Sequence, residues 1–197
     1  MRQRLTQGLI QVYTGNSKGK STAAFGLALR AIGHGFKVYI IQFMKGSGYY
    51  GELATWHRLY PYIQFSQYGR GCPYSHLIRQ GEDSCRGCGQ CFVKKGEATA
   101  EDIRQAAMAL EKTRKIMATD EFDIIILDEV LNAIYFELIS TKEVLELINN
   151  KPPLVELVLT GRNAPPEIIA AAHLVTEMKE IKHPFQQGIS ARRGIEY

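Results

Sequence analysis

A run of small, basic and hydroxyl residues near the start of the chain has the composition of a phosphate-binding loop. Its glycines let backbone N–H groups approach an anion, and we expect Lys20 to neutralise phosphate oxygens. The Ser21 hydroxyl is a suitable ligand for the Mg²⁺ that accompanies a triphosphate. The usual loop has four residues between its glycines, whereas Gly15 and Gly19 enclose three, so this loop is a variant. The residues expected to bind ATP here are Gly15, Asn16, Ser17, Lys18, Gly19, Lys20, Ser21 and Thr22.

Two acidic residues, Asp128 and Glu129, directly follow the apolar run 122–127. Beside a phosphate loop, one such carboxylate typically orients the water shell of the metal, and the other contacts the metal or activates a nucleophile. Without the loop, two acids at a helix start would more often be solvated. We therefore expect Ser21, Asp128 and Glu129 to hold Mg²⁺, with Lys20 and Glu129 as the catalytic residues.

Arg162 lies in a polar turn, 160–163, that follows another apolar run. An arginine at this position either reaches the phosphates of a nucleotide or caps a turn at the surface. We include Arg162 among the residues expected to bind ATP.

The cysteines form one pattern, C-x12-C-x2-C-x2-C. A spacing of two residues lets neighbouring thiolates bind one metal, and three cysteines in succession are typical of iron–sulfur sites more than of zinc sites. The pattern favours a [4Fe-4S] cluster over Zn²⁺, and four free thiols in a loop are the alternative. The residues concerned are Cys72, Cys85, Cys88 and Cys91.

The elements that must position these residues alternate between strand and helix. Apolar and β-branched runs predict strands at 9–14, 38–43, 63–68, 122–127, 154–160 and 174–178. Helices are expected at 21–32, 52–59, 99–118, 131–138, 141–149 and from Pro165 onward. Thr99 and Asp102 can cap the long helix 99–118, because a hydroxyl and a carboxylate satisfy free N–H groups in its first turn. This order predicts an α/β fold whose mostly parallel sheet has helices on both faces. In such sheets ligands bind beyond the carboxyl ends of the strands, where the phosphate loop and the acidic pair would lie.

Length and composition indicate one domain over residues 1–197, with a cysteine-containing insertion at about 69–96 rather than a second domain. The net charge of +4 suits an anionic ligand, but the basic residues are scattered, so nucleic acid is not an expected partner. No apolar run reaches the roughly 18 residues of a membrane span. We expect a cytoplasmic protein that does not associate with membranes.

Several segments together resemble the P-loop type of ATP:corrinoid adenosyltransferase, the cob(I)yrinic acid a,c-diamide adenosyltransferases. The shortened phosphate loop and the closing segment recur together in that family, and the resemblance runs nearly from end to end. It implies a P-loop NTPase-like (RecA-like) fold. The segments that carry it are 8–15, 18–22, 42–46, 127–129, 159–162, 182–185 and 193–197.

The resemblance implies transfer of the 5′-deoxyadenosyl group of ATP to the cobalt of a reduced corrinoid, with release of triphosphate, in adenosylcobalamin biosynthesis or salvage. Ser21 and Glu129 would hold Mg²⁺, and Tyr74 would contact the corrinoid, either cobalamin or a precursor. Relatives carry two aromatic residues flanking one position in this stretch, whereas this chain keeps only Tyr74. A reductase or flavodoxin-like electron donor and a homodimer are further implications.

Two alternatives remain open on the residues alone. The chain could be a P-loop phosphotransferase or ATPase in which Glu129 positions an acceptor or a water. It could instead be a metal or redox module that is regulated by ATP and acts through its cysteine loop. Release of ADP would indicate the first, and absorption that responds to redox state without corrinoid turnover would indicate the second.

Overall fold

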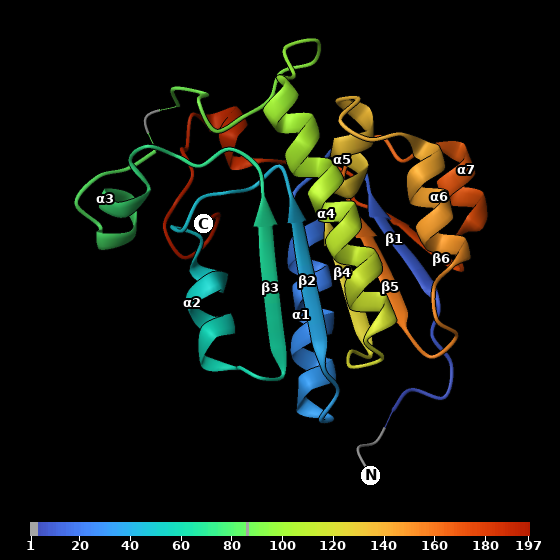
Figure 1. Ribbon diagram of the computed structural model, residues 1–197. Coiled ribbons are helices and arrows are strands. Elements are labelled where there is room, and N and C mark those ends of the chain that lie inside the picture. The colour runs from blue at the N-terminus through green and yellow to red at the C-terminus, as the bar shows by residue number, and fades with distance from the viewer. Residues whose placement is uncertain (1–3, 86) are drawn as a thin grey trace.

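Six parallel strands form one sheet through the middle of the protein (Figure 1). The computed structural model describes residues 4–85 and 87–197, and the strands follow the order β3-β2-β4-β5-β1-β6. They are β1 (Ile10–Thr14), β2 (Val38–Phe43), β3 (Ile63–Tyr68), β4 (Ile124–Asp128), β5 (Glu156–Thr160) and β6 (Leu174–Glu177). The predicted α/β class with a P-loop NTPase-like parallel sheet is confirmed.

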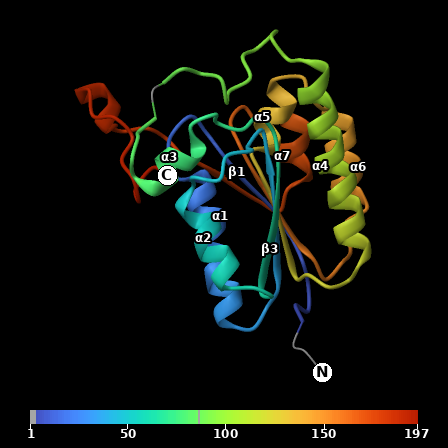
Figure 2. The same ribbon diagram turned by 60° about the vertical axis from the view of Figure 1, so that its left-hand side comes forward.

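Helices cover both faces of the sheet, as Figure 2 shows with the strands nearly edge-on. One face carries α1 (Lys20–Gly33) and α2 (Gly51–Arg58). The other carries α4 (Ala100–Ala118), α5 (Val130–Tyr135), α6 (Thr141–Asn149) and α7 (Pro166–Ala171). None of the helices in the described part of the chain is long and apolar enough to cross a membrane.

The central strands are buried on both faces, which explains their nearly continuous apolar sequences. In β4, Ile125 and Leu127 pack into the core on the side of α4. Ile124 and Ile126 belong to the core on the side of α1. Because successive side chains of a strand point to opposite faces, the central strand β4 contributes to both cores. The ends of the strands are thereby fixed where the functional loops begin.

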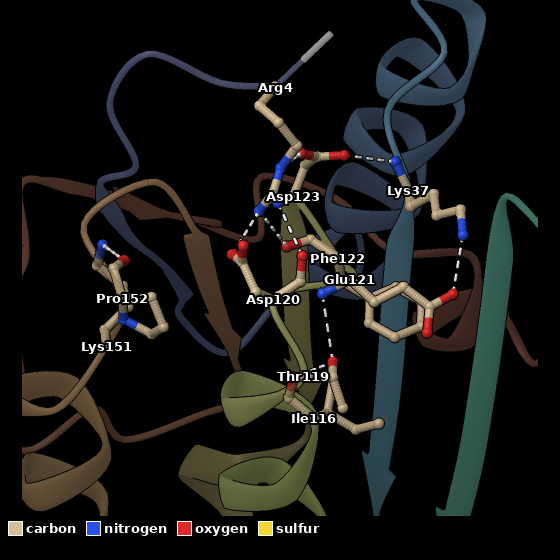
Figure 3. A network of polar contacts seen from close by, with 10 residues as sticks. All are labelled: Arg4, Lys37, Ile116, Thr119, Asp120, Glu121, Phe122, Asp123, Lys151 and Pro152. Atoms are coloured by element: carbon tan, nitrogen blue, oxygen red, sulfur yellow. Dashed lines mark hydrogen bonds and ion pairs between the residues drawn. The ribbon is translucent and has the colours of Figure 1, made fainter. Parts of the chain in front are cut away.

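A polar network holds the amino end of β4, at the edge of the sheet opposite the predicted site (Figure 3). The carboxylate of Asp123 is fully buried, and it accepts hydrogen bonds from Arg4 Nε at 2.6 Å and from the Lys37 N–H at 2.8 Å. The Asp123 N–H in turn donates to the Lys37 carbonyl at 2.9 Å. A buried charge needs such partners, so this network stabilises the pairing of β2 with β4.

The insertion between β3 and α4 contains a short helix, α3 (Ser75–Gln80), which ends at Gly81 with a positive φ of 84°. Sequence analysis expected no regular element here, because a helix of six residues is too short to display an apolar repeat. A second short element, the 3-10 helix Pro184–Gln187, was missed for the same reason.

The predicted cap of the long helix α4 is confirmed. The Thr99 hydroxyl accepts from the Asp102 N–H, and the Asp102 carboxylate accepts from the Thr99 N–H at 2.8 Å. Asp102 also accepts from Arg70 Nε at 2.8 Å. Arg70 lies two residues after β3, so its ion pair with the buried Asp102 ties the start of the insertion to the start of α4.

Replacing Asp102 with alanine is expected to lower the free energy of unfolding by about 2–3 kcal/mol, because the capping box loses its carboxylate and Arg70 loses its partner. Hydrogen bonds from Arg70 lower the pKa of Asp102 to about 2. The stabilisation is therefore complete above the pKa of an unfolded aspartate, about 3.9, and is lost as the pH falls toward the folded value. Urea unfolding at about pH 7 and about pH 3 should show a smaller difference from wild type at the lower pH.

The matched control is Glu101→Ala, which removes an exposed carboxylate from the same helical turn. This change should alter the free energy of unfolding by less than about 0.5 kcal/mol. An equal decrease in the free energy of unfolding in the two variants would show that the Arg70–Asp102 pair contributes no more than an exposed carboxylate.

Candidate active site

The phosphate loop connects β1 to α1, as the sequence predicts, and its two glycines have conformations that other residues rarely adopt. Gly15 has a φ of 100° and Gly19 a φ of 120°. A Cβ atom on Gly15 would lie 2.3 Å from the carbonyl oxygen of Met178. The Ser17 N–H donates to that same carbonyl at 3.3 Å. The segment after β6 therefore supports the loop from behind, and only glycine fits at position 15.

A cavity of about 850 Å³ opens beside this loop at the carboxyl ends of the strands. Its size lies within the range of small-molecule sites. Predicted residues that line it are Asn16, Ser17, Lys18, Gly19, Lys20, Ser21, Thr22, Glu129 and Arg162. The structure therefore brings together the three separate segments expected to surround a nucleotide.

Lys20 is the buried cation of the loop, with 7% of its surface exposed. Its Nζ donates to the Ser17 carbonyl at 2.7 Å. Burial lowers the pKa of Lys20, and the negative charge of Glu129 opposes this shift. An ammonium group has three N–H donors, so Lys20 can contact a phosphate at the cavity wall while it keeps its bond to the loop.

Asp128 ends β4 and lies beneath the cavity with its side chain fully buried. Its Oδ1 accepts from Thr160 Oγ1 at 2.8 Å. Its Oδ2 accepts from Lys45 Nζ at 2.8 Å and from Gln42 Nε2 at 3.0 Å. Burial acts to raise the pKa of Asp128, but Lys45 and the hydrogen bonds outweigh it, so the pKa is lowered. Asp128 is therefore a charged group that orients its neighbours.

Glu129 begins α5 and points its carboxylate at the cavity. Its backbone has a left-handed φ of 64°, and its N–H donates to Thr160 Oγ1 at 3.0 Å. The Asn132 amide donates to its carboxylate and also accepts from the Arg162 N–H at 2.6 Å. Burial and the neighbouring Asp128 raise the pKa of Glu129, and they outweigh the opposing effect of the nearby cations.

The donor set at this position suits magnesium. Mg²⁺ takes oxygen ligands, usually one or two from the protein, with phosphate oxygens and waters as the others. The Ser21 hydroxyl and the Glu129 carboxylate both line the cavity. Ser21 lies close enough to Asp128 to contribute to the lowered pKa of that carboxyl. Ser21 and Glu129 can hold the ion directly, whereas both Asp128 oxygens already have protein partners.

The structure does not support the metal site predicted at the four cysteines. Cys72, Cys85, Cys88 and Cys91 are free thiols, and Cys85 and Cys88 are exposed. Among the described residues, no group of three or more His, Cys, Asp or Glu side chains is arranged to hold a metal ion. The structure therefore does not support a [4Fe-4S] cluster or Zn²⁺ at this loop.

Two predicted site residues do not line the cavity, and some residues that line it were not predicted. Within residues 4–85 and 87–197, the lining includes neither Gly15 nor Tyr74, and Tyr74 instead precedes α3. Lys45, Phe25 and Tyr50 line it although they were not among the predicted site residues. Lys45 follows a strand as a lone lysine, and only the pairing of β2 with β4 places it beside Asp128.

The closing segment folds back over the phosphate loop. Lys18 Nζ lies 3.0 Å from Glu196 Oε1, and the Tyr197 ring packs edge-on against Tyr49 with 5.5 Å between ring centroids. Residues 194–197 consequently line the cavity. This contact explains why a distant segment accompanies the loop in the sequence resemblance.

Comparison with known proteins matches residues 6–197 to the family model described as ATP:corrinoid adenosyltransferase BtuR/CobO/CobP. The chain belongs to this family. Among its relatives, the corrinoid adenosyltransferase of Sinorhizobium sp is 35% identical over 192 residues, which cover 97% of this chain and 81% of the relative. That of Pseudomonas aeruginosa is 34% identical, with 97% and 84% covered. That of Escherichia coli (strain K12) is 31% identical, with 97% and 86% covered.

Membership of the ATP:corrinoid adenosyltransferase family accounts for the joint presence of the shortened loop, the acidic pair and the closing segment. Each of these segments contributes to the wall of one cavity. The family resemblance inferred from the sequence is confirmed.

Proposed function

We propose that the chain transfers the 5′-deoxyadenosyl group of ATP to the cobalt of a reduced corrinoid and releases triphosphate, as a step of adenosylcobalamin biosynthesis or salvage. The chain belongs to the ATP:corrinoid adenosyltransferase family, and the phosphate loop, Lys20 and Glu129 line one and the same cavity. This shared cavity is the observation that carries the proposal. The aromatic residues Phe25, Tyr50 and Phe185 line the same cavity and suit a nucleoside or the edge of a corrin ring.

The reaction is a displacement at the 5′ carbon of the ribose. The electron pair of the cob(I) centre forms the cobalt–carbon bond, and the bond between the 5′ carbon and oxygen breaks with its electron pair on the triphosphate. No proton has to be transferred, so no general base is required. The protein has two tasks, which are to orient the 5′ carbon toward cobalt and to stabilise the charge that builds on the leaving group.

The phosphate loop and Lys20 serve the second task. Backbone N–H groups at the start of α1 and the Lys20 ammonium offer fixed donors to the departing triphosphate, and the helix dipole adds to them. Arg162 contributes a further cation from the end of β5, held by the bond of its N–H to Asn132. Lys18 and Thr22, at the rim of the loop, complete the contacts to the polyphosphate.

Magnesium, held by Ser21 and Glu129, would neutralise part of the triphosphate charge when it is bound. Asp128 supports this arrangement because it accepts a hydrogen bond from the Thr160 hydroxyl, which in turn accepts from the Glu129 N–H. The buried carboxylate thus acts through the orientation of its neighbours.

The corrinoid must arrive in its cob(I) state, so a one-electron donor is part of the proposal. The family suggests a reductase or a flavodoxin-like protein in this role, and it suggests that the enzyme works as a homodimer. Tyr74 is proposed to contact the corrinoid from the insertion, outside the nucleotide cavity.

Incubation with ATP, Mg²⁺ and a chemically reduced corrinoid is expected to yield one light-sensitive cobalt–carbon bond for each triphosphate released. Anion-exchange chromatography of the phosphate products and the visible spectrum before and after illumination measure the two. The same reaction without corrinoid should release no triphosphate. Formation of ADP instead would identify a phosphotransferase or ATPase and would overturn the proposal.

A further inference from the structure

Three cations line the same cavity as the Glu129 carboxylate, and the proposed reaction uses only two of them. Lys20, Lys45 and Arg162 all line the cavity, and the positive charge of each acts to lower the pKa of Glu129. Lys20 begins α1, whereas Lys45 follows β2 on the other side of the acidic pair. In the sheet order, β4 and β5 separate β2 from β1. Lys20 and Lys45 therefore approach Glu129 from opposite sides.

The backbone holds Lys45 firmly in this position. Met44, the residue before it, has a left-handed φ of 58°. The next residue, Gly46, packs so closely that an added Cβ would lie 2.3 Å from the carbonyl oxygen of Gly69. A Cβ on Gly69 would in turn lie 2.4 Å from the Met44 carbonyl carbon. The segments that follow β2 and β3 are thus packed backbone against backbone. This packing fixes the turn after β2 that carries Lys45.

The side chain of Lys45 has features of a ligand-binding cation. Its Nζ lies 2.8 Å from Asp128 Oδ2 and 5.2 Å from the centroid of the Tyr50 ring. The side chain is 17% exposed, and Lys45 lines the cavity. Asp128 accepts hydrogen bonds from Gln42 and Thr160 in addition, so its oxygens have partners other than Lys45. An ammonium with three donors retains capacity for a phosphate oxygen while it contacts Asp128.

We propose that Lys45 is a second phosphate-contacting lysine, which stabilises the leaving triphosphate together with Lys20. The inference rests on the proposed function, because it assigns Lys45 a contact with the leaving group of that reaction. The competing explanation is that Lys45 serves only as the counter-ion that keeps Asp128 charged while buried. The two explanations differ in what happens when position 128 no longer carries a charge.

The test compares Asp128→Asn with the double variant Asp128→Asn, Lys45→Met. In the single variant Lys45→Met, Asp128 would remain as a buried carboxylate without its cation, which would unfold the protein. Asparagine at position 128 carries no charge, so the removal of Lys45 from Asp128→Asn leaves no such carboxylate. Isothermal calorimetry with inorganic triphosphate and Mg²⁺ measures binding without catalysis. We expect the dissociation constant to rise at least about tenfold, and kcat for adenosyl transfer to fall about 100-fold, between the first variant and the second.

Equal triphosphate affinity and equal kcat in the two variants would overturn the proposal and leave Lys45 as a counter-ion. Lys94→Met removes an exposed lysine of the insertion, 73% exposed and outside the cavity lining, and should change neither quantity. Circular dichroism and thermal unfolding show whether each variant is folded. Wild-type protein that binds triphosphate but forms no cobalt–carbon bond would overturn the proposed function alone, and the binding comparison for Lys45 would still hold.

Discussion

Replacement of Lys20 with alanine is expected to lower kcat for adenosyl transfer by about 10³-fold, while the protein remains folded. The ammonium is buried at the cavity wall and contacts the loop that would hold the triphosphate. Charge grows on the triphosphate as the bond to the 5′ carbon breaks, so the lost cation matters more in the transition state than in bound ATP. The KM for ATP should consequently rise by a smaller factor than kcat falls. Steady-state kinetics with saturating reduced corrinoid measure both values.

Two controls make the Lys20 result specific. Lys115→Ala removes an equal charge from an exposed position on α4 and should leave kcat unchanged. Lys20→Arg keeps the charge but changes its geometry, and we expect partial activity, because a guanidinium does not occupy the position of an ammonium. Near-normal kcat in folded Lys20→Ala protein would contradict the assigned role and would shift the proposed stabilisation to Lys45 and Arg162.

The regular elements were accessible from the sequence because burial dictates their composition. The strands predicted at 38–43 and 63–68 have the bounds of β2 and β3 in the structure. β2 is buried along its whole length, so every position had to be compatible with the core. The cap at Thr99 and Asp102 was equally visible, since it depends on two side chains a fixed distance apart along the chain.

The site was predictable where it depends on a local motif and was not predictable where it depends on contacts between segments. The phosphate loop and the acidic pair have fixed spacings at the ends of strands. Lys45 is a lone lysine after a strand, and only the pairing of β2 with β4 brings it to Asp128. The partners of Asp128, which occupy both of its oxygens, were hidden for the same reason.

The spacing of the cysteines leads to a prediction that the structure does not support. Their spacing predicts a shared metal, but spacing constrains thiols only when the backbone between them has a defined turn. The insertion has one short helix, α3, and none of its cysteines lies in that helix. The sheet, which places the residues of the active site, does not extend into this part of the chain.

Replacement of Glu129 with glutamine is expected to lower kcat about 100-fold at Mg²⁺ concentrations that saturate the wild-type enzyme. Glutamine keeps the size of the side chain and an oxygen that can accept from Asn132, so the start of α5 should remain intact. The change removes the negative charge of a residue proposed to bind the metal. Calorimetric titration of ATP should show that Mg²⁺ strengthens binding less in this variant than in wild type.

The dependence on Mg²⁺ distinguishes a metal ligand from a residue that only shapes the pocket. If Glu129 binds the ion, higher Mg²⁺ concentrations should restore part of the activity of Glu129→Gln, because mass action compensates for a weaker site. Glu180→Gln provides the matched control, since Glu180 lines the same cavity but lies in the segment after β6, away from Ser21 in the chain. An unchanged Mg²⁺ dependence in Glu129→Gln would exclude Glu129 as a ligand, and the buried Asp128 would then have to exchange one of its protein partners for the metal.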